Sequence, residues 1–252
     1  MTETKPVLIT GATGKIGRVL VRHFAANGRT VIATSPNPDN LAALVAALPG
    51  KHVIPVPANL AEPGGSEGLV HQLTAAKLFP AALINNARNA ANIVLAADGR
   101  PSHAAWLAEF ALGVVAPYEL GWSLAHQSGS RLESIVNVSS MYGIVAMNPS
   151  LYDDPSRQSP VHYGPVKSAL VQLTKELAVR LAGKAIRVNA VSFGGVEGRV
   201  DANFQARYAK LNPQGRMLHE DEVAGAVEFL ISDGASAMTG HNLVVDGGWS
   251  IW

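Results

Sequence analysis

The chain has no cysteine and few charged residues. Its 252 residues include no Cys, which excludes disulfides, thiolate nucleophiles and zinc sites with Cys ligands. Any redox activity would therefore depend on a bound cofactor. Charged residues make up 15% of the chain, and 20 Lys and Arg against 19 Asp and Glu give a net charge of +1. This balance argues against nucleic acid as a partner, and the 8 His show no metal-ligand spacing, so no metal site is expected.

Long apolar runs are also missing. The most apolar segment, residues 104–125, is interrupted by Glu109, Pro117 and Glu119, whereas a membrane span needs about 18 uninterrupted apolar residues. We expect this segment to form a buried helix. The first ten residues lack the positive start and apolar stretch of a secretory signal. The sequence therefore predicts a cytoplasmic protein with no membrane partner.

Short runs rich in Val and Ile alternate with longer stretches of helical period. The expected strands are residues 6–10, 30–34, 52–56, 81–85, 134–138, 186–191 and 242–245. A stripe from Val166 to Leu181, with apolar residues every three or four positions, indicates a helix that packs on the sheet. This alternation predicts an α/β fold with a doubly wound, seven-stranded parallel sheet. No change of composition marks a second domain, so residues 1–252 are expected to form a single domain.

A glycine-rich turn, TGATGKIG, follows the first expected strand and opens a helix. Glycines in this turn allow backbone N–H groups at the helix N-terminus to approach a pyrophosphate. We expect dinucleotide binding through Gly11, Thr13, Gly14, Lys15, Ile16 and Gly17. The alternative is that Gly14 only relieves crowding in a structural turn.

The end of the second expected strand bears on the choice of dinucleotide. A carboxylate at this point would bind the adenosine ribose and select NAD. The chain has Ser35 and Pro36 there instead. We therefore expect NADP, with NAD as the alternative, and Ser35 as a cofactor contact.

Tyr163 and Lys167 are four residues apart and share one face of an expected helix. A phenol ordinarily has a pKa of about 10, and a neighbouring ammonium favours its ionised form, which suits general acid/base catalysis. Ser140 stands at the carboxyl end of the fifth expected strand, where it could orient a carbonyl oxygen.

The ordered motifs TGATGKIG, INNAR, IVNVSS, YGPVK, IRVNAVS and MTGHNLVVDGGW resemble the short-chain dehydrogenase/reductase family over residues 10–249. The resemblance implies a Rossmann-like fold, commonly assembled as a homodimer or homotetramer. It places the family's catalytic residues on Ser140, Tyr163 and Lys167, with Tyr163 exchanging a proton with substrate and Lys167 holding the nicotinamide ribose. It also implies cofactor contacts at Asn59, Leu60, Asn86, Ala87, Arg88, Gly194 and Val196.

The chain departs from the family pattern at several positions. Gly113 stands where the family usually has an Asn that completes a proton relay. Arg88 replaces a Gly, and it either contacts a cofactor phosphate or points to solvent. Phe193 replaces a Pro before Gly194. These departures leave open a catalytically lapsed dinucleotide-binding sensor or structural subunit.

The spacing of 23 residues between Ser140 and Tyr163 is longer than the family's usual spacing. The additional polar loop carries Tyr152, Asp153, Asp154 and Arg157, and we expect it at the mouth of the substrate site. This region also resembles members linked to bacterial surface-sugar and flagellin modification.

The function that these observations favour is an NAD(P)-dependent oxidoreductase. It would interconvert a carbonyl and an alcohol on a polar small-molecule substrate, a class that includes sugar-related compounds. A sugar-nucleotide epimerase or dehydratase is disfavoured because the chain lacks a second, substrate-binding domain. Trp249 and Trp252 are expected to pack against a neighbouring subunit.

Overall fold

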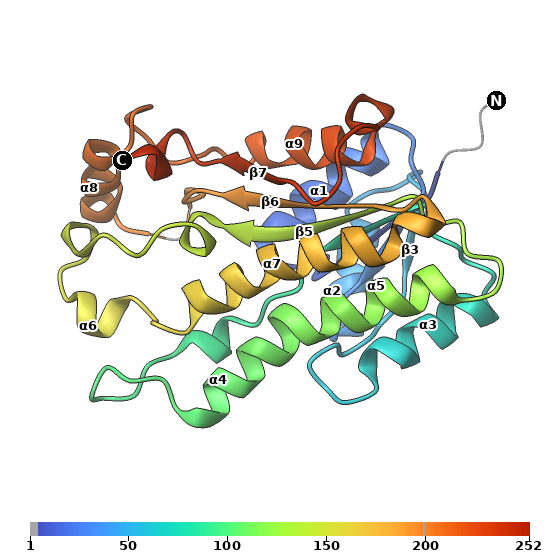
Figure 1. Cartoon of the computed structure of the whole chain (residues 1–252), viewed down its shortest axis with the longest axis horizontal. Helices are drawn as coiled ribbons and strands as arrows, with labels where there is room; N and C mark the ends of the chain where they lie inside the picture. The colour runs from blue at the N-terminus through green and yellow to red at the C-terminus, as the bar shows by residue number, and fades with distance from the viewer. Residues whose placement is uncertain (1–4, 199) are drawn as a thin grey trace.

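A computed structural model describes residues 5–198 and 200–252. Residues 1–4 and residue 199 lie outside the described residues. Residues 1–4 belong to the N-terminal segment in which the sequence shows no secretory signal. One seven-stranded parallel sheet runs through the molecule in the order β3-β2-β1-β4-β5-β6-β7 (Figure 1). Its strands are β1 (Val7–Thr10), β2 (Val31–Thr34), β3 (Val53–Pro55), β4 (Ala82–Asn85), β5 (Ser134–Ser140), β6 (Arg187–Phe193) and β7 (Asn242–Val245). The predicted seven-stranded, doubly wound α/β fold is confirmed.

The strand order reverses between β1 and β4. Val7 pairs with Val31 of β2 on one side and with Ala82 of β4 on the other, all in parallel. Open α/β sheets bind their ligands beyond the carboxyl ends of the strands at such a reversal. All residues of β1, β2, β4 and β5 are buried, which explains their continuous apolar character.

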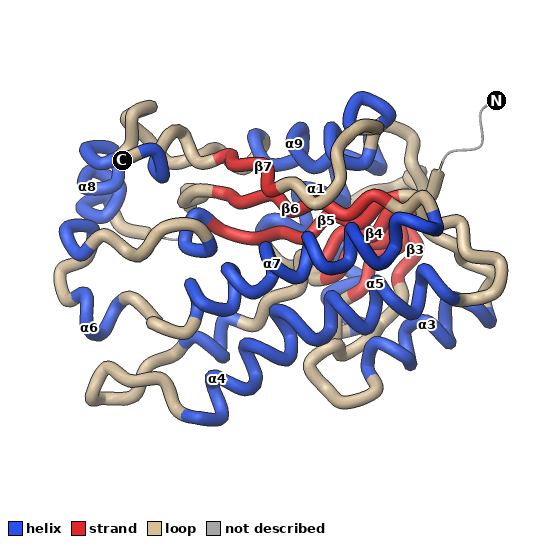
Figure 2. Tube along the Cα trace, in the orientation of Figure 1, coloured by secondary structure: helices blue, strands red, loops and turns tan. Residues whose placement is uncertain are grey.

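Helices cover both faces of the sheet (Figure 2). Their bounds are α1 (Lys15–Ala26), α2 (Pro38–Ala46), α3 (Gly65–Ala75), α4 (His103–Phe110), α5 (Ala116–His126), α6 (Pro155–Gln158), α7 (Tyr163–Leu181), α8 (Ala202–Leu211) and α9 (Glu222–Ile231). One core cluster joins α1, α2 and α9 to the sheet, and a second joins α3, α5 and α7 to its other face. The expected apolar stripe of α7 belongs to this second layer, because Leu177 and Leu181 are fully buried there.

The segment 104–125 is only partly buried, so the expectation of a buried helix is wrong in part. It comprises α4, a π-helical turn at Ala111–Val115 (η2) and α5. Leu120 and Leu124 are fully buried, whereas Leu107 is 59% exposed and Phe110 43%. The segment is amphipathic because one side alone meets the sheet. Within the described ranges, no helix is both long enough and apolar enough to cross a membrane.

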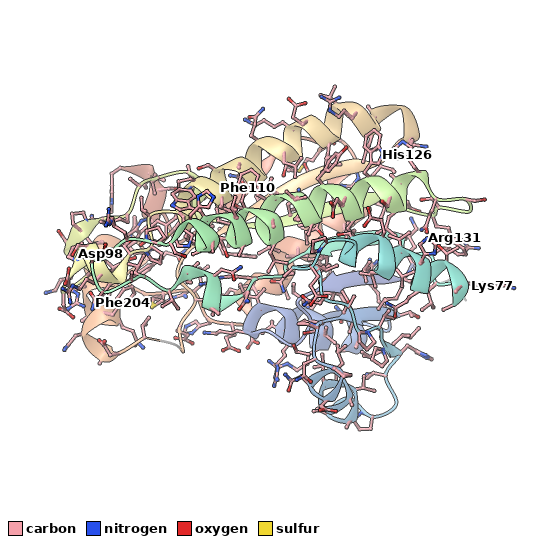
Figure 3. All side chains as sticks on the ribbon, turned by 90° about the horizontal axis from the view of Figure 1, so that it is seen from below. Lys77, Asp98, Phe110, His126, Arg131 and Phe204 are labelled. Atoms are coloured by element: carbon pink, nitrogen blue, oxygen red, sulfur yellow. The ribbon has the colours of Figure 1, made fainter. Side chains whose placement is uncertain are left out.

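The carboxyl ends of the strands face one end of the molecule, and their amino ends face the other. Figure 3 shows Asp98 and Phe204 at one end and Lys77 and Arg131 at the other. Phe204 comes from α8, which lies beyond the carboxyl ends of β5 and β6 (Figure 1). The loops and short helices at this end therefore enclose the region where ligands are expected.

The two C-terminal tryptophans differ in their surroundings. Trp249 is 5% exposed and stacks on Tyr208, with 4.5 Å between the ring centroids. The expectation that Trp249 packs against another subunit is therefore wrong, because its partner is in the same chain. Trp252 is 76% exposed.

Candidate active site

The glycine-rich turn connects β1 to α1 and packs tightly against the loop after β4. Gly11 has φ +62°, a conformation that L-residues with side chains rarely adopt. A Cβ at Gly11 would lie 2.8 Å from the Cα of Ala87, and a Cβ at Gly17 would overlap the Gly11 carbonyl oxygen. These two glycines are thus required by close approach of backbone to backbone.

The N-terminus of α1 is open toward a cavity. Gly14 is the N-cap and provides no side-chain cap to the helix N–H groups, and Gly14, Lys15 and Ile16 all line the cavity. A Cβ at Gly14 would lie 3.2 Å from the Gly11 oxygen, which is tight but less severe than at Gly17. Uncapped N–H groups at a helix N-terminus suit an anionic group. The cradle therefore fits the pyrophosphate of a dinucleotide.

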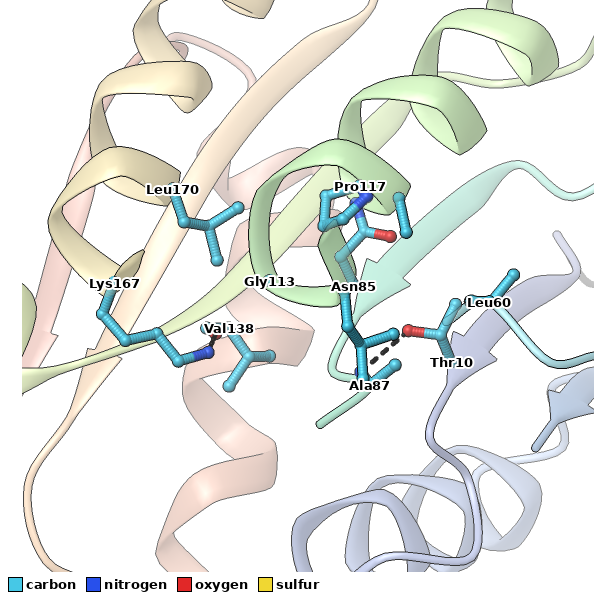
Figure 4. A pocket seen from close by; sticks show the side chains of 11 residues that line it. Thr10, Leu60, Asn85, Ala87, Gly113, Pro117, Val138, Lys167 and Leu170 are labelled. Carbon is cyan, nitrogen blue, oxygen red and sulfur yellow. Dashed lines mark hydrogen bonds between the residues drawn. The ribbon is translucent and has the colours of Figure 1, made fainter. Parts of the chain in front are cut away.

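Hydrogen bonds hold the loop after β4 against the glycine-rich turn. The Thr10 hydroxyl accepts the backbone N–H groups of Asn86 and Ala87, each at 2.9 Å. The Asn86 side-chain amide donates to the Thr10 carbonyl at 3.0 Å. Figure 4 shows Thr10 and Ala87 joined in this way. The two loops that face the cavity are therefore fixed relative to each other.

Tyr163 and Lys167 lie together at the start of α7. Lys167 is 6% exposed, and its Nζ donates a 2.9 Å hydrogen bond to the Val138 carbonyl (Figure 4). The same Nζ lies 5.9 Å from the centroid of the Tyr163 ring. The helical spacing thus brings the ammonium beside the phenol.

Ser140 ends β5 and lines the same cavity. Its hydroxyl oxygen accepts the Tyr142 N–H at 3.2 Å, which leaves the hydroxyl proton available. The neighbouring Ser139 donates its hydroxyl to the Lys167 carbonyl at 3.1 Å and is committed to α7. Ser140 is therefore the better placed of the two to hold a substrate oxygen.

These elements surround a cavity of about 480 Å³. It brings together many of the residues predicted from the sequence, namely Gly11, Gly14, Lys15, Ile16, Asn86, Arg88, Ser140, Tyr163, Lys167, Gly194 and Val196. Among the described residues that line it there is no Asp or Glu. The charged side chains of its described lining are therefore all cations, and six residues with hydroxyl groups line it beside a larger number of apolar residues.

Six predicted cofactor residues do not line this cavity: Thr13, Gly17, Ser35, Asn59, Leu60 and Ala87. The hydroxyl of Thr13, in the glycine-rich turn, lies 2.7 Å from the hydroxyl of Ser35, which directly follows β2. Asn59 instead donates to Glu62 at 2.8 Å within its own loop.

Sequence reasoning missed one cation near the end of β2. Arg18 is in the first turns of α1, and its Nε donates to the Thr13 carbonyl at 2.8 Å. Thr13 in turn contacts Ser35, where a carboxylate would stand in a site selective for NAD. The segment from the end of β2 to Gly50 contains no Lys or Arg, whereas this cation comes from α1, the helix after β1. Its position four residues after Gly14 was the available signal.

Lys15 is not the solvated residue that a helix start often carries. Its side chain is 13% exposed and lies 3.5 Å from Glu220. Its Nζ also donates to the Val196 carbonyl at 3.3 Å. Lys15 thus ties the glycine-rich turn to the segment after β6.

Val166 packs against Gly113, the residue at which the family resemblance implies a relay Asn. A Cβ at Gly113 would lie 2.5 Å from Val166 Cγ1. A void of about 10 Å³ remains beside Gly113 and Lys167 (Figure 4). A void of this size holds at most about one water molecule.

The additional loop before α7 contributes Tyr152 and Pro160 to the cavity and is anchored by other residues. Tyr152 lines the cavity, and its hydroxyl lies 2.8 Å from that of Tyr142. Burial and the neighbouring Tyr152 raise the pKa of Tyr142 well above its ordinary value, so Tyr142 stays neutral. Asp153 pairs with Arg207 of α8 at 2.8 Å. The expected polar loop therefore does reach the cavity mouth, through Tyr152.

Arg88 lies over the ring of Tyr163. Its Cζ is 5.0 Å from the ring centroid, a cation–π distance. The sequence left two alternatives for Arg88, a cofactor phosphate or bulk solvent. The structure adds a third feature, contact with the expected catalytic tyrosine.

Comparison with known proteins gives matches to reductases and dehydrogenases over nearly the whole chain. A family model described as Enoyl-(Acyl carrier protein) reductase matches residues 11–250. A 3-oxoacyl-[acyl-carrier-protein] reductase of Thermotoga maritima is 33% identical over 98% of each chain. A galactitol 2-dehydrogenase (L-tagatose-forming) of Cereibacter sphaeroides is 29% identical over 97% of this chain and 94% of the relative.

Two further comparisons extend this result. An uncharacterized short-chain type dehydrogenase/reductase of Sinorhizobium fredii is 34% identical over 96% of this chain, which spans only 43% of that longer relative. The solved structure of a 4-hydroxyisoleucine dehydrogenase complexed with NADH has a TM-score of 0.85 and 26% identity, and the match covers 99% of this chain and 100% of that one.

Proposed function

Because the chain belongs to the short-chain dehydrogenase/reductase family, we propose that this oxidoreductase interconverts a carbonyl and an alcohol on a polar small molecule. The observation that carries the proposal is the single cavity in which Ser140, Tyr163 and Lys167 meet the glycine-rich turn. A nicotinamide dinucleotide supplies or accepts the hydride when it is bound. The chain's own residues then position the substrate oxygen and move its proton.

Each of the three polar residues has a distinct role in this proposal. In the reducing direction, the Tyr163 hydroxyl donates its proton to the substrate oxygen. The Ser140 hydroxyl donates a hydrogen bond that orients the same oxygen. The Lys167 ammonium, 5.9 Å from the Tyr163 ring, stabilises the negative charge left on the phenol.

The dinucleotide is held by the glycine-rich turn, with its pyrophosphate at the N-terminus of α1. We favour NADP over NAD because Arg18 stands beside Thr13 and Ser35, where a 2′-phosphate would need a cation. The related 4-hydroxyisoleucine dehydrogenase is complexed with NADH, so NAD is the alternative to be tested.

A polar, hydroxylated substrate, including a sugar derivative, suits the lining of the cavity. The hydroxyls of Tyr142, Tyr152 and Ser140 all line it. The related galactitol dehydrogenase is named for a polyol, which supports the same class. We do not propose a lapsed sensor, because Ser140, Tyr163 and Lys167 all line one cavity with the glycine-rich turn, which supports an active enzyme.

Assembly as a homodimer or homotetramer is part of the proposal. Exposed apolar side chains support it, since Leu107 and Phe110 on α4 and Val244 on β7 are 59%, 43% and 43% exposed. Such side chains are commonly covered in oligomers. Light scattering at micromolar concentration would test it.

The central experiment is Tyr163→Phe, with Tyr118→Phe on the exposed side of α5 as the matched control. Loss of the proton donor should lower kcat at least about 100-fold, as is typical of general acid/base catalysts. NADPH affinity, measured by nucleotide fluorescence, should change little in either variant. Full turnover by Tyr163→Phe would refute the proposed mechanism.

A further inference from the structure

Arg88 is the one cation of the cavity without a polar partner among the residues that the structure describes. We propose that Arg88 binds a carboxylate of the substrate, so that the enzyme acts on a hydroxy acid or oxo acid. This inference rests on the proposed oxidoreductase function and narrows its substrate class.

The position of Arg88 places a guanidinium at the reacting group. Its Cζ lies 5.0 Å from the centroid of the Tyr163 ring, and its side chain is exposed and lines the cavity. A guanidinium carries its N–H donors in one plane, where two of them can form parallel hydrogen bonds with a carboxylate. The contact with the ring thus holds Arg88 beside Tyr163 without a hydrogen bond to its donors.

The other two cations that line the cavity are already engaged. Lys167 donates to the Val138 carbonyl at 2.9 Å. Lys15 donates to the Val196 carbonyl and lies 3.5 Å from Glu220. Among the described residues that line the cavity, Arg88 is therefore the cation that is free to take an anionic group of a ligand.

The charge of the cavity favours the same conclusion. No Asp or Glu lines it within residues 5–198 and 200–252. A substrate that enters removes water from Arg88, and a neutral substrate would leave that charge unpaired, which is unfavourable. A carboxylate would compensate the desolvation.

The geometry also limits the length of the substrate. Arg88 stacks on the same ring whose hydroxyl is expected to protonate the substrate oxygen. A carboxylate bound by Arg88 therefore lies within a few bonds of the reacting carbon. Short oxo acids and their hydroxy acids fit this description, and so do the acids derived from sugars.

The test compares acids with their neutral analogues. Reduction of 2-oxobutanoate, 3-oxobutanoate and 4-oxopentanoate is measured beside that of their primary amides, with NADPH and with NADH. The variants are Arg88→Gln, Arg88→Lys and, as a control, Arg100→Ala, whose side chain is 82% exposed and pairs with Asp98. Binding of pentanoate and of pentanamide to the cofactor-loaded protein is measured by thermal stabilisation.

We expect at least one oxo acid to be reduced with a kcat/KM about tenfold or more above that of its amide. Arg88→Gln should remove that preference by lowering the value for the acid about 10- to 100-fold, as expected for loss of a hydrogen bond to a charged group. The value for the amide should fall much less than that for the acid, and the affinity for the dinucleotide should stay nearly constant. Arg88→Lys should restore part of the preference, and Arg100→Ala should match the wild type.

The other outcomes separate the two proposals. Equal turnover of acids and amides, unaffected by Arg88→Gln, would overturn the carboxylate site and leave the oxidoreductase intact. Weaker NADPH binding with an equal loss for acids and amides would assign Arg88 to a cofactor phosphate and also overturn it. Stabilisation by pentanoate that Arg88→Gln abolishes, without reduction of any carbonyl, would retain the carboxylate site while contradicting the proposed function.

Discussion

The side chain of Val166 occupies the space next to Gly113, so that a Cβ at residue 113 would lie 2.5 Å from Val166 Cγ1. Gly113 is buried in the π-helical turn, and Val166 is fully buried one residue before Lys167. Val166 therefore fills the volume beside Gly113, the position at which the family resemblance implies an Asn side chain. The pair forms one packing unit near Lys167.

This packing makes the effect of a small side chain at residue 113 predictable. Gly113→Ala should lower the free energy of unfolding by about 1–3 kcal/mol, because overpacking displaces Val166. Adding Gly113→Ala to Val166→Ala should cost little or nothing, since the clashing methyl group is gone. Urea denaturation of the three variants measures the coupling, and additive losses would contradict it.

A buried chain of side-chain hydrogen bonds crosses the middle of the sheet. Asn85 donates to Asn137 at 2.8 Å, and Asn137 donates to Thr174 of α7 at 2.9 Å. Asn137→Ala would leave the Asn85 amide without this acceptor, which should lower the free energy of unfolding by about 1–3 kcal/mol. Asn203→Ala, on the exposed side of α8, is the control and should be nearly neutral. Equal urea midpoints for the two variants would show that the chain of hydrogen bonds does not stabilise the sheet.

The sequence alone was sufficient to predict the strands of the sheet and many, though fewer than half, of the residues that line the cavity. Strands buried on both faces read as continuous apolar runs, and the Tyr163–Lys167 spacing follows directly from helical geometry. Such features can be predicted because they depend on residues that are close in the sequence, and tertiary contacts do not alter them.

The remaining features depend on contacts between distant segments. The stacking of Arg88 on Tyr163 joins residues from the ends of two different elements, and the approach of Arg18 to Thr13 depends on a side-chain rotamer. The exposure of Leu107 was also missed, because apolar periodicity does not tell which face of a helix meets the sheet. Of these features, only the position of Arg18, four residues after Gly14, has a local sequence signal.

Arg18 provides a direct test of the preferred dinucleotide. Arg18→Ala should weaken NADPH binding about 10- to 100-fold, the range for a lost hydrogen bond to a charged group, and leave NADH binding nearly constant. Arg22→Ala, one turn further along α1 and also exposed, is the matched control. Fluorescence titration with both nucleotides distinguishes the cases. A parallel loss for NADH and NADPH, or no loss at all, would contradict the assignment of Arg18 to the 2′-phosphate.

The segment 216–222 contacts Val196 and is held by an ion pair between Arg216 and Glu222. We expect this ion pair to be lost at low pH. Arg216 donates to both carboxylate oxygens of Glu222 at 2.7 and 2.8 Å, and the His219 N–H donates to the same carboxylate. The Arg216 side chain, followed by the His219 N–H, lowers the pKa of Glu222 to about 2. Leu218, between these residues, forms a parallel bridge with Val196.

Because the pKa of Glu222 is lower in the folded protein than its ordinary value of 4.5, the stabilisation is present above about pH 4.5 and is lost as the pH falls toward 2. Both side chains are more than a third exposed, so Glu222→Gln should lower the free energy of unfolding at pH 7 by at most about 1 kcal/mol. The difference from wild type should shrink as the pH is lowered from 5 to about 3 in urea denaturation.

Glu176→Gln, which breaks a single-contact pair with Arg180 on α7, serves as the control and should lower the free energy of unfolding by about 0.3–0.5 kcal/mol at pH 7. A difference between Glu222→Gln and wild type that stays constant down to pH 3 would mean that the carboxylate charge does not stabilise the segment, and that the neutral hydrogen bonds alone hold Leu218 against Val196.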